Sequence, residues 1–600
     1  MVEWLARTVS NQTVDLAVFE AVGETRVDRV PGDSERPVVV LVHGWPDTHD
    51  VWREVAAALT PTAEVFAYDT RGIGASDRPD GVSPYRIENL ADDLFAVAAA
   101  VGGGRKVHVV AHDWGSIQSW EAISRPEASS AFASFTTISG PCLDHAAMLL
   151  RHNLTHPSPT NLANTLAQAV CSTYIAIFHL PVVPTLMLNV LGIGRVWRGF
   201  LKIMDGTPPE KVITGPTLRR DMISGVRYYR ANMIRKILRP NPRITDVPVL
   251  ELINSRDFAI RTTTFSTTHR YVRKFWRRDG ATGHWLPSTH PDYIARTVSD
   301  FIGMLDGHPD TPDVLTRARR FGPEQALSGR LAVITGAGSG IGRETALAMS
   351  AAGCDVVLAD LDHDAAGDTA QLCKESGVAA TAYGLDVSDT PAYAEFATTV
   401  AANHGVPDIL VNNAGIGLSG ESLAATDAQI DRLLEVNLRG VITGCREFGK
   451  QMVAQGTGGH IVNLASAAAF TPQRGLGVYA ASKAGVLLYS ESLRGELADA
   501  HIGVTAICPG IVDTPIVANS PIAGLDEIDS ASEQQRLSDL YRRRGYTPDK
   551  VAREIIAAIG ADKAVVPVTT EAQFGYRLYR FAPWISRIAA RRRVVGARPS

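Results

Sequence analysis

Two strand–turn–helix openings, far apart in one chain, constrain the fold more than any other feature of this sequence. In the first, the β-branched run Val107–Ala111 leads into HDWG at positions 112–115 and then into a helical stretch. In the second, Leu331–Thr335 leads into GAGSGIG at positions 336–342. Alternating strand and helix patterns follow each opening, so the sequence predicts two α/β units in series. The two halves do not resemble each other, which predicts a fusion and not a repeat.

Length, charge and cysteine usage narrow the class of protein further. Six hundred residues correspond to roughly two to four domains. Lys and Arg number 59 against 63 Asp and Glu, a net charge of −4 that argues against a nucleic-acid partner. Six scattered cysteines without a C-x-x-C pair predict reduced thiols and a cytoplasmic protein, and no metal ligands are predicted. No secretory signal is predicted from the N-terminal residues, and the apolar run nearest to a membrane span, Leu180–Gly194, is short and contains two prolines.

The first unit contains a candidate catalytic set. Asp113 stands in the middle of the first opening, where a strand, a tight turn and a helix place a side chain on a sharp elbow above the sheet edge. A nucleophile there would be a carboxylate. Farther along, Asp257 follows the predicted strand Val249–Ile253 and His284 lies in TGHW, so an acid and a histidine follow in that order. Rival candidates for the acid and the base are Asp246 and His290.

Composition shifts and this spacing set the predicted domain boundaries. The stretch between the units is rich in Pro, Gly and charge and has no sustained apolar period. Too many residues separate Asp113 from Asp257 for one helical crossover, so we expect a lid domain between them. The predicted parts are the first unit at 1–306 with its lid at about 141–245, a linker at 307–328, the second unit at 329–570 and a tail at 571–600.

With these motifs, residues from about 15 to 305 resemble an α/β-hydrolase of the epoxide hydrolase group. HGWP at positions 43–46 resembles the oxyanion loop and HDWG the nucleophile elbow, although Ala111 stands where many relatives carry Gly. The resemblance implies a carboxylate that opens a strained ether through an alkyl ester, two lid tyrosines that stabilise the leaving oxygen, and a histidine that activates water. By that resemblance Asp113 is the nucleophile, and Asp257 and His284 form the acid–base pair. The two lid tyrosines are Tyr174 and Tyr229, with Tyr228 as a rival. The backbone N–H groups of Trp45 and Trp114 are the oxyanion donors.

Other hydrolases of this fold fit less well. Haloalkane dehalogenases also use an Asp followed by Trp, but they commonly carry Asn where Trp45 stands. Fluoroacetate-type dehalogenases carry Arg where Trp114 stands, and Asp113 excludes serine esterases. Arg71 is interpreted as structural, paired with a buried carboxylate. A haloalkane dehalogenase therefore remains the alternative for this half.

The second unit opens like a dinucleotide-binding domain. Glycines allow the tight turn and a close approach of the backbone to a pyrophosphate, which the helix N-terminus then faces. Asp360 ends the next predicted strand, Asp355–Ala359, about 20 residues on, where a carboxylate accepts the ribose hydroxyls. The same carboxylate repels a 2′-phosphate and no basic residue follows at Leu361, so NAD is favoured over NADP.

From Gly329 to about Val568 the chain resembles a short-chain dehydrogenase/reductase. TGAGSGIG, LDV (385–387), NNAG (412–415), YAASK (479–483) and CPG (508–510) occur in family order. The resemblance implies a catalytic set of Asn437, Ser466, Tyr479 and Lys483, in which the positive Lys483 lowers the pKa of Tyr479. It implies cofactor contacts from Gly336, Ser339, Gly340, Ile341, Gly342, Asp360, Asp386, Val387, Asn413, Ala414, Gly415, Tyr479, Lys483, Pro509 and Gly510. Asn412 and Gly338 are interpreted as structural, and Pro515–Thr547 is predicted to form an irregular, polar lid.

The C-terminal tail combines arginines with aromatic residues. Seven arginines lie between Arg577 and Ser600, where no acidic residue occurs, and Phe581, Trp584 and Ile588 interleave with them. This pattern fits an interfacial helix on a membrane, and it fits a solvated extension or a dimer contact equally well.

As a whole, the chain resembles the fused epoxide hydrolase–dehydrogenases of the epoxide hydrolase D type from mycolic-acid-making actinobacteria. That resemblance covers nearly the whole sequence and implies lipid or small-molecule epoxides and alcohol or ketone substrates. It allows a homo-oligomer through the dehydrogenase half and a cytoplasmic protein with peripheral membrane contact through the tail. The alternative is that one half is retained only as a binding or scaffold module.

Overall fold

The computed structural model describes residues 2–11, 13–23, 36–307, 313–320, 325–525 and 527–590. The chain divides into two compact units, each described by itself. The first comprises the residues up to the predicted linker together with the short strand at 319–320, and the second comprises 313–317 and the residues from 325 onward. Among the described residues, no helix combines the length and apolarity that crossing a membrane requires.

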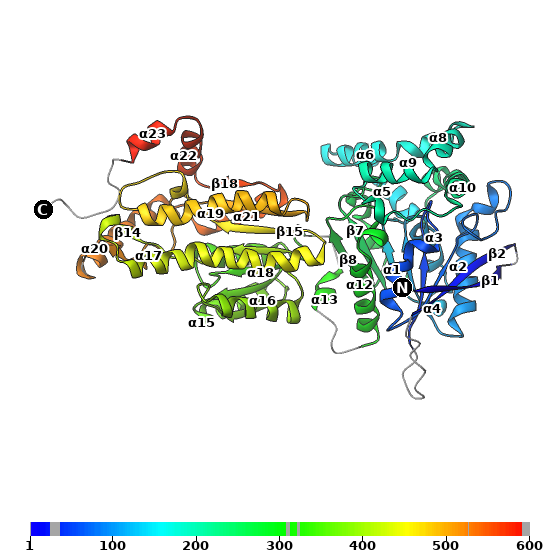
Figure 1. Ribbon diagram of the computed structural model, residues 1–600, viewed down its shortest axis with the longest axis horizontal. Helices are drawn as coiled ribbons and strands as arrows, with labels where there is room; N and C mark the ends of the chain where they lie inside the picture. Colours follow the sequence, from blue (N-terminus) through cyan, green and yellow to red (C-terminus); the bar gives the residue numbers. More distant parts are fainter. Residues whose placement is uncertain are drawn as a thin grey trace. The chain divides into compact units, whose positions relative to one another are not determined.

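The first unit is built on a nine-stranded sheet in the order β1-β2-β4-β3-β5-β6-β7-β8-β9 (Figure 1). The six strands from β4 to β8 run parallel, whereas β2 pairs antiparallel with β4, β1 with β2, and β9 with β8. Their near-continuous apolar sequences suit strands that are covered on both faces. The bounds are β1 Glu3–Asn11, β2 Val14–Val22, β3 Val38–Val42, β4 Glu64–Tyr68, β5 Val107–His112, β6 Phe132–Ile138, β7 Val249–Asn254, β8 Phe275–Gly280 and β9 Arg319–Arg320.

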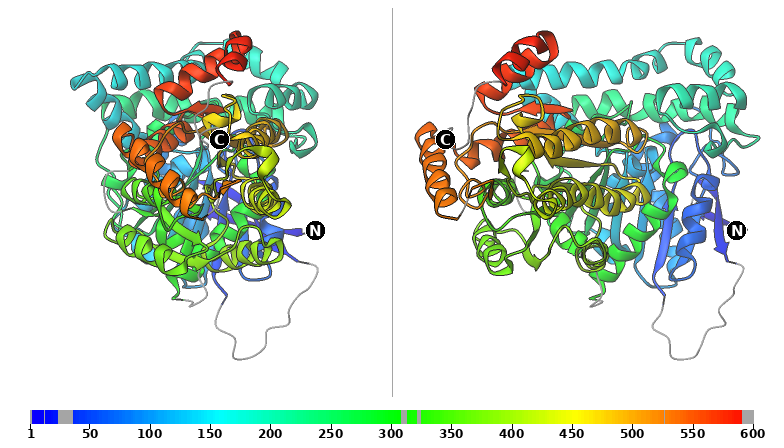
Figure 2. Two further views of the ribbon diagram at one scale, coloured as in Figure 1. Left: turned by 90° about the vertical axis from the view of Figure 1, so that its left-hand side faces the viewer. Right: turned by 60° about the vertical axis from the view of Figure 1, so that its left-hand side comes forward.

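Helices flank this sheet and a helical lid is inserted between β6 and β7. Helices α2 and α3 pack on the sheet core, and α1 packs with α12. The sheet-flanking helices are α1 Arg53–Leu59, α2 Ile87–Gly102, α3 Trp114–Ile123, α4 Ala128–Ala131, α11 Leu286–Thr289 and α12 Pro291–Leu305. The lid helices are α5 Leu143–Thr155, α6 Pro159–Cys171, α7 Thr173–Phe178, α8 Val183–Leu191, α9 Gly194–Met204 and α10 Leu218–Leu238. Figures 1 and 2 show them together beyond one end of the sheet, which confirms the predicted hydrolase fold with a helical lid.

The second unit has a seven-stranded, all-parallel sheet in the order β12-β11-β10-β13-β15-β16-β18. The order reverses at β10 and β13, and a ligand crevice forms at such a switch point in open α/β sheets. The bounds are β10 Leu331–Thr335, β11 Asp355–Asp360, β12 Ala380–Gly384, β13 Ile409–Asn412, β15 Gly459–Leu464, β16 Ile502–Cys508 and β18 Val565–Pro567, beside a small pair of β14 Ser419–Gly420 and β17 Ile522–Ala523. The predicted Rossmann-type fold is confirmed.

Two layers of helices cover this sheet. One core cluster joins the sheet to α14, α15 and α21, and another joins it to α16, α18 and α19. The bounds are α13 Asp313–Ala318, α14 Gly340–Ala351, α15 His363–Lys374, α16 Thr390–His404, α17 Asp427–Leu434, α18 Gly440–Gln455, α19 Gly477–Glu496, α20 Glu527–Arg544, α21 Pro548–Gly560, α22 Thr570–Phe581 and α23 Pro583–Ala589.

The segment predicted to be irregular is largely helical. Helix α20 occupies 18 of the residues between Pro515 and Thr547, so that prediction was wrong. This segment is rich in good helix formers, namely Glu, Gln, Arg, Leu and Ala. Their intrinsic propensity favours a helix even where the sequence shows no apolar stripe. The stretch between the units likewise contains α13 and β9. Of the tail, α22 and α23 are described, whereas the arginines at 591–593 and 598 lie outside the described residues.

Candidate active sites

Asp113 lies on a sharp elbow between β5 and α3. Its backbone has φ of +49°, a conformation that a non-glycine residue adopts only when its surroundings enforce it. Close packing enforces it here, because a Cβ at Gly115 would overlap the Val42 carbonyl oxygen and one at Gly140 would overlap that of Asp113. The strained turn presents the carboxylate at the sheet edge while leaving it only 7% exposed.

Two backbone N–H groups hold that carboxylate. The Trp45 N–H donates to Asp113 Oδ1 at 2.8 Å, and the Trp114 N–H also donates to the carboxylate. Burial raises the pKa of Asp113, while the charge of His284 and these two donors act against the rise. The two predicted oxyanion residues therefore surround the carboxylate, and the same donors can hold a negative oxygen that forms on its carbon.

His284 links the nucleophile to a buried acid. Its Nδ1 lies 2.8 Å from Asp257 Oδ2, and its Nε2 lies 3.7 Å from Asp113 Oδ2. The other oxygen of Asp257 accepts the N–H groups of Ala259 and Ile260 at 2.8 and 2.9 Å. Burial alone would lower the pKa of His284, but the charges of Asp257 and Asp113 raise it to about 10.

The rival acid and base lie elsewhere. Asp246 pairs with Arg273 at the surface, with Nε and Oδ1 3.0 Å apart. His290 caps α12 and contacts the Thr289 hydroxyl through Nδ1 at 2.9 Å. Arg71 forms two hydrogen bonds with buried Asp93, at 2.7 and 2.9 Å, which is the structural pairing that the sequence predicts.

Two lid tyrosines meet above the nucleophile. Tyr174 on α7 and Tyr229 on α10 hydrogen-bond to each other, and their ring centroids lie 5.8 Å apart. The charge of Asp113 contributes, after burial, to raising the pKa of both phenols, so both lie within its field. Tyr228 instead donates to the Arg71 carbonyl at 2.5 Å and lies 3.0 Å from the Thr70 hydroxyl. The structure thus brings Tyr174 and Tyr229, and not Tyr228, to the site.

Three further residues support the site and were not predicted. Asp205 at the end of α9 accepts the His284 N–H at 2.5 Å, so a lid residue fixes the histidine loop. Asp47 accepts from the Trp285 indole at 3.0 Å, and burial raises its pKa to about 7. His112 donates from Nε2 to the His284 carbonyl at 2.9 Å. Only His112, inside the HDWG motif, had a signal in the sequence.

The Gly-rich turn of the second unit forms a cradle that a side chain would fill. A Cβ at Gly336, which has φ of +64°, would lie 2.8 Å from Ala414 Cα, and one at Gly342 would overlap the Gly336 carbonyl oxygen. Asp360 ends β11 and accepts the Gly338 N–H at 2.8 Å, so its carboxylate lies directly beside the turn. A helix N-terminus, an open glycine turn and a carboxylate fit the diphosphate and ribose of a dinucleotide.

The predicted catalytic residues of this unit converge at the end of β15. The hydroxyls of Ser466 and Tyr479 are hydrogen-bonded, and the Lys483 ammonium donates to the Leu464 carbonyl at 2.8 Å. Asn437, in a π-helical turn at Glu435–Arg439, bonds both the N–H and the carbonyl of Ile416, at 2.8 and 2.9 Å. A Cβ at Gly415 would lie 3.2 Å from Asn437 Oδ1 and 3.4 Å from Lys483 Nζ, so glycine leaves that junction open.

The expected pKa pattern differs from the observed one. Burial raises the pKa of Tyr479 to about 12, and the hydrogen bond with Ser466 opposes the rise. Burial also lowers the pKa of Lys483 to about 8. The predicted lowering of the Tyr479 pKa by Lys483 is not observed, because burial, the Ser466 hydroxyl and the charge of Tyr541 are the groups that shift this pKa, and Lys483 is not among them.

The other predicted cofactor contacts lie around the same edge. Asn413 Nδ2 donates to the carbonyls of Thr335 and Gly336, and the Ala414 N–H donates to the Thr335 hydroxyl. Asp386 accepts from Ser388 and Arg432, and Val387 is buried against Gly440. Ser339 and Gly340 lie at the start of α14, and Ile341 packs against the core. The Pro509 carbonyl accepts the Ala467 N–H, and Gly510 packs on Thr569. Asn412 bonds Asn463 Oδ1 at 2.8 Å, a structural contact.

Comparisons with known proteins agree with the folds of the two units. Residues 37–165 match the family model of the alpha/beta hydrolase fold, and residues 330–522 match that of the short chain dehydrogenases. "Probable oxidoreductase EphD" of Mycobacterium tuberculosis (strain ATCC 25618 / H37Rv) is 41% identical over 573 residues, which are 94% of this chain and 96% of that protein. "Sorbitol dehydrogenase" of Cereibacter sphaeroides is 37% identical over 187 residues, 31% of this chain and 72% of that protein. A crystal structure of a short chain dehydrogenase/reductase from Burkholderia phymatum in complex with NAD is 28% identical, with a TM-score of 0.40, and covers 46% of this chain and 99% of that chain.

Proposed function

This chain belongs to the EphD family of oxidoreductases, in which a hydrolase-fold unit is fused to a short-chain dehydrogenase, and we propose that both units are catalytic. The first unit hydrolyses epoxides to vicinal diols through an ester on Asp113. The second unit interconverts a hydroxyl and a carbonyl with NAD. One observation carries the first proposal: a carboxylate held by two N–H donors lies between a buried His–Asp pair and two tyrosines.

The first step opens the epoxide ring. Asp113 Oδ2 attacks a ring carbon, a C–O bond forms, and the ring C–O bond breaks with its electrons going to the ring oxygen. Tyr174 or Tyr229 donates its phenolic proton to that oxygen. Both pKa values are high, so both phenols carry their protons and can donate.

The second step releases the diol. His284 Nε2 takes a proton from water, whose oxygen attacks the ester carbon, and the negative charge that forms on Oδ1 faces the N–H groups of Trp45 and Trp114. The bond between that carbon and the diol oxygen then breaks, the Asp113 carboxylate reforms, and the imidazolium returns its proton to the departing alkoxide. Ester formation removes the charge of Asp113, which is one cause of the raised pKa of His284. The pKa of His284 therefore falls when the ester forms, which favours the neutral imidazole that acts as the base. Asp257 holds that ring and stabilises the imidazolium that results.

The geometry disfavours the haloalkane dehalogenase alternative. The Trp45 indole N–H donates to the Met222 carbonyl at 3.1 Å, so it does not point to the nucleophile as a halide donor. The Trp114 side chain is hydrogen-bonded to Tyr229. Both indoles are thus engaged, whereas two phenols suited to a leaving alkoxide face Asp113.

Replacing the lid tyrosines should slow ring opening. Tyr174→Phe and Tyr229→Phe should each lower kcat for an epoxide by about 10²-fold, since each loses one donor to the developing alkoxide. Tyr228→Phe is the matched control, because its hydroxyl bonds the Arg71 carbonyl and should affect stability more than rate. Steady-state kinetics with one epoxide compare the three. Equal losses in all three variants would contradict the assignment.

The second unit fits a nicotinamide dinucleotide. The glycine cradle, Asp360 and Lys483 would hold its diphosphate and riboses, and the nicotinamide supplies or accepts hydride when bound. Tyr479 exchanges a proton with the substrate oxygen, and Ser466 orients that oxygen through its hydroxyl. Lys483, four residues farther along α19, would reach the nicotinamide ribose and orient the cofactor beside the Tyr479 phenol.

Asp360 should decide the cofactor. The wild-type protein should bind NAD at least about tenfold more tightly than NADP, because a 2′-phosphate would lie against this carboxylate. Asp360→Asn should narrow that difference, whereas Asp362→Asn, at the N-cap of α15, should leave it unchanged. Fluorescence titration of the full-length protein with both dinucleotides measures the ratio. Equal affinities of the wild-type protein for the two would refute the preference.

The substrate class follows from the family resemblance and from the apolar lining of the lid. Lipid epoxides and lipid alcohols or ketones are the proposed substrates, and self-association through the dehydrogenase unit is the proposed assembly. Product analysis of the full-length protein with a lipid epoxide, with and without NAD, tests the function. A diol without NAD is expected. Absence of the diol would contradict the hydrolase assignment. A folded variant that lacks both catalytic activities but keeps its cellular role would favour a scaffold function.

A further inference from the structure

A stretch of the lid carries no charged side chain although it lies at the surface. From His152 to Gly194, 43 consecutive residues include no Asp, Glu, Lys or Arg, where the chain average of 20% would place about nine. This stretch spans α6, α7 and α8. Figures 1 and 2 show α6 and α8 in the outer layer of the lid, away from the sheet.

The uncharged stretch presents two apolar stripes, here called the lid face. Both stripes follow i, i+4, i+8 spacing, which places three side chains on one side of a helix. Their members are 49–67% exposed, whereas large aliphatic side chains are normally buried. The lid face consists of Leu162, Leu166 and Val170 on α6, and Val182, Leu186 and Val190 on α8 or its N-cap.

The lid around this face is strongly basic. Residues 141–245 contain thirteen Lys and Arg against four Asp and Glu, a formal charge of +9 in a chain whose net charge is −4. Three of the four acids, Asp144, Asp205 and Asp221, are buried, so Glu210 is the only exposed acid of the lid. A second copy of such a lid would repel the first, whereas an anionic surface attracts it.

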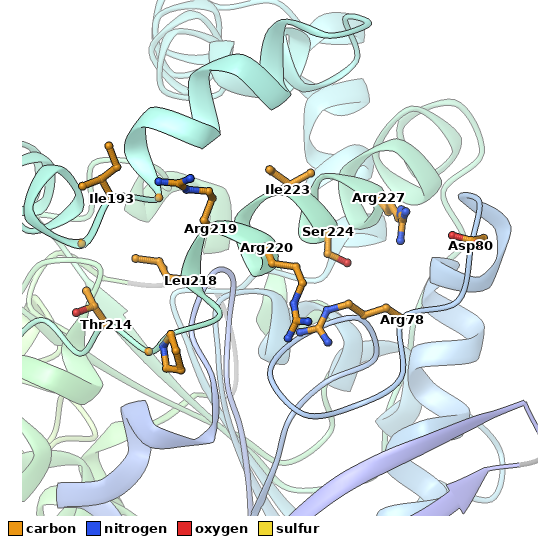
Figure 3. Close-up of a pocket in the computed structure, with 14 residues that line it drawn as sticks. Arg78, Asp80, Ile193, Thr214, Leu218, Arg219, Arg220, Ile223, Ser224 and Arg227 are labelled. Carbon is orange, nitrogen blue, oxygen red and sulfur yellow. The ribbon is translucent and has the colours of Figure 1, made fainter.

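The uncharged stretch ends at a cleft of about 810 Å³ that is lined by arginines (Figure 3). Arg219 and Arg220 at the start of α10 line it, and among the described residues neither guanidinium has an ion-pair partner. Arg78 and Arg227 also line it, but Arg78 pairs with Asp221 at 2.7 Å and Arg227 bonds the Tyr85 hydroxyl at 3.0 Å. The acid at its rim is Asp80. We call this the arginine cleft.

The end of α8 and the start of α9 form one wall of the arginine cleft. Ser224 also lines the cleft and is 6% exposed, but its hydroxyl oxygen is buried and faces Gly72. The N-terminus of α9, at Gly194, lies in the wall and contributes unpaired N–H groups. A Cβ at Gly192 would lie 2.7 Å from Arg219 Cα, so the end of α8 packs tightly against this site. Arginines and a helix N-terminus together suit a phosphate.

We propose that the lid docks on an anionic phospholipid bilayer, with the lid face entering the leaflet and the arginine cleft holding the phosphate of one lipid. Apolar side chains at the surface bind the acyl region, and basic side chains beside them bind the headgroups, as in interfacial helices. The lid also covers Asp113 and His284, so docking would place the hydrolase entrance at a lipid surface. This proposal does not depend on the reaction, because binding is measured without substrate.

The test is flotation of the full-length protein with vesicles of phosphatidylcholine, alone or with phosphatidylglycerol. Tighter binding to the anionic vesicles is expected. Leu186→Asp with Val190→Asp should weaken binding at least tenfold, since two apolar contacts become charged. Arg219→Gln with Arg220→Gln should weaken it about thirtyfold. Exposed side chains are changed in each case, and unchanged thermal melting checks the fold.

Two control pairs separate the lid from other surfaces. Arg446→Gln with Lys450→Gln removes the same charge from α18 and should change binding by less than about twofold. Phe581→Asp with Trp584→Asp changes the exposed aromatic side chains of α22 and α23 and should leave most of the binding intact. Equal binding to both kinds of vesicle, or lid variants that bind like the parent, would overturn the proposal. Loss of binding only in the variant with Phe581→Asp and Trp584→Asp would also overturn the proposal, and would assign the membrane contact to α22 and α23.

Discussion

Asp113→Asn should abolish epoxide hydrolysis, with a loss of kcat of at least about 10³-fold, because the amide cannot form the ester. His284→Gln should stop at the ester, because the ring still opens but no base activates water. Intact-mass measurement of the His284 variant after incubation with an epoxide should show one added substrate mass. The Asp113 variant should show none.

Matched variants distinguish chemistry from folding in this half. Asp246→Asn changes an exposed carboxylate that pairs with Arg273, and His290→Gln changes a histidine outside the site. Both should retain most of the activity. An adduct missing from the His284 variant, together with activity in Asp113→Asn, would show that water attacks the epoxide directly.

In the second unit, Tyr479→Phe should reduce NAD-dependent turnover at least about 10³-fold, because its phenol is the proposed proton donor or acceptor. Lys483→Met should produce a comparable loss and also weaken NAD binding. Epoxide hydrolysis should remain unchanged in both variants, since the two catalytic sets lie in separate units.

Helix α19 offers a control for the tyrosine. Tyr489→Phe changes another phenol on that helix, one that contacts Cys445 and not Ser466. NADH formation with a secondary alcohol and NAD compares the variants. If the Tyr479→Phe variant were as active as the Tyr489→Phe variant, the proposed role of Tyr479 in proton transfer would be contradicted.

Local sequence signals predicted the parts of the fold that depend on local geometry. The run Val107–Ala111 and HDWG predicted the elbow because a strand, a tight turn and small residues leave few backbone paths. The glycines from 336 to 342 likewise predicted the cradle, since a Cβ at Gly336, Gly338 or Gly342 would overlap neighbouring atoms. Asp360 was placed by spacing alone, at the end of the next strand.

Contacts across the lid could not be predicted in the same way. Asp205 reaches the His284 N–H over 79 positions of sequence, and nothing near Asp205 in the sequence marks that contact. The choice between Tyr228 and Tyr229 depends on the rotation of α10 about its axis, which periodicity does not fix to one residue. The error on the Tyr479 pKa has a related origin, because burial is a property of the assembled unit.

The covalent route through Asp113 is tested most directly by single turnover in ¹⁸O-water, with enzyme in excess over a lipid epoxide. Attack of water on the ester carbon leaves the new oxygen in the carboxylate, while the diol departs with an oxygen that belonged to Asp113. The account therefore predicts ¹⁸O in the peptide that contains Asp113 and an unlabelled diol. A labelled diol with an unlabelled Asp113 peptide would contradict it.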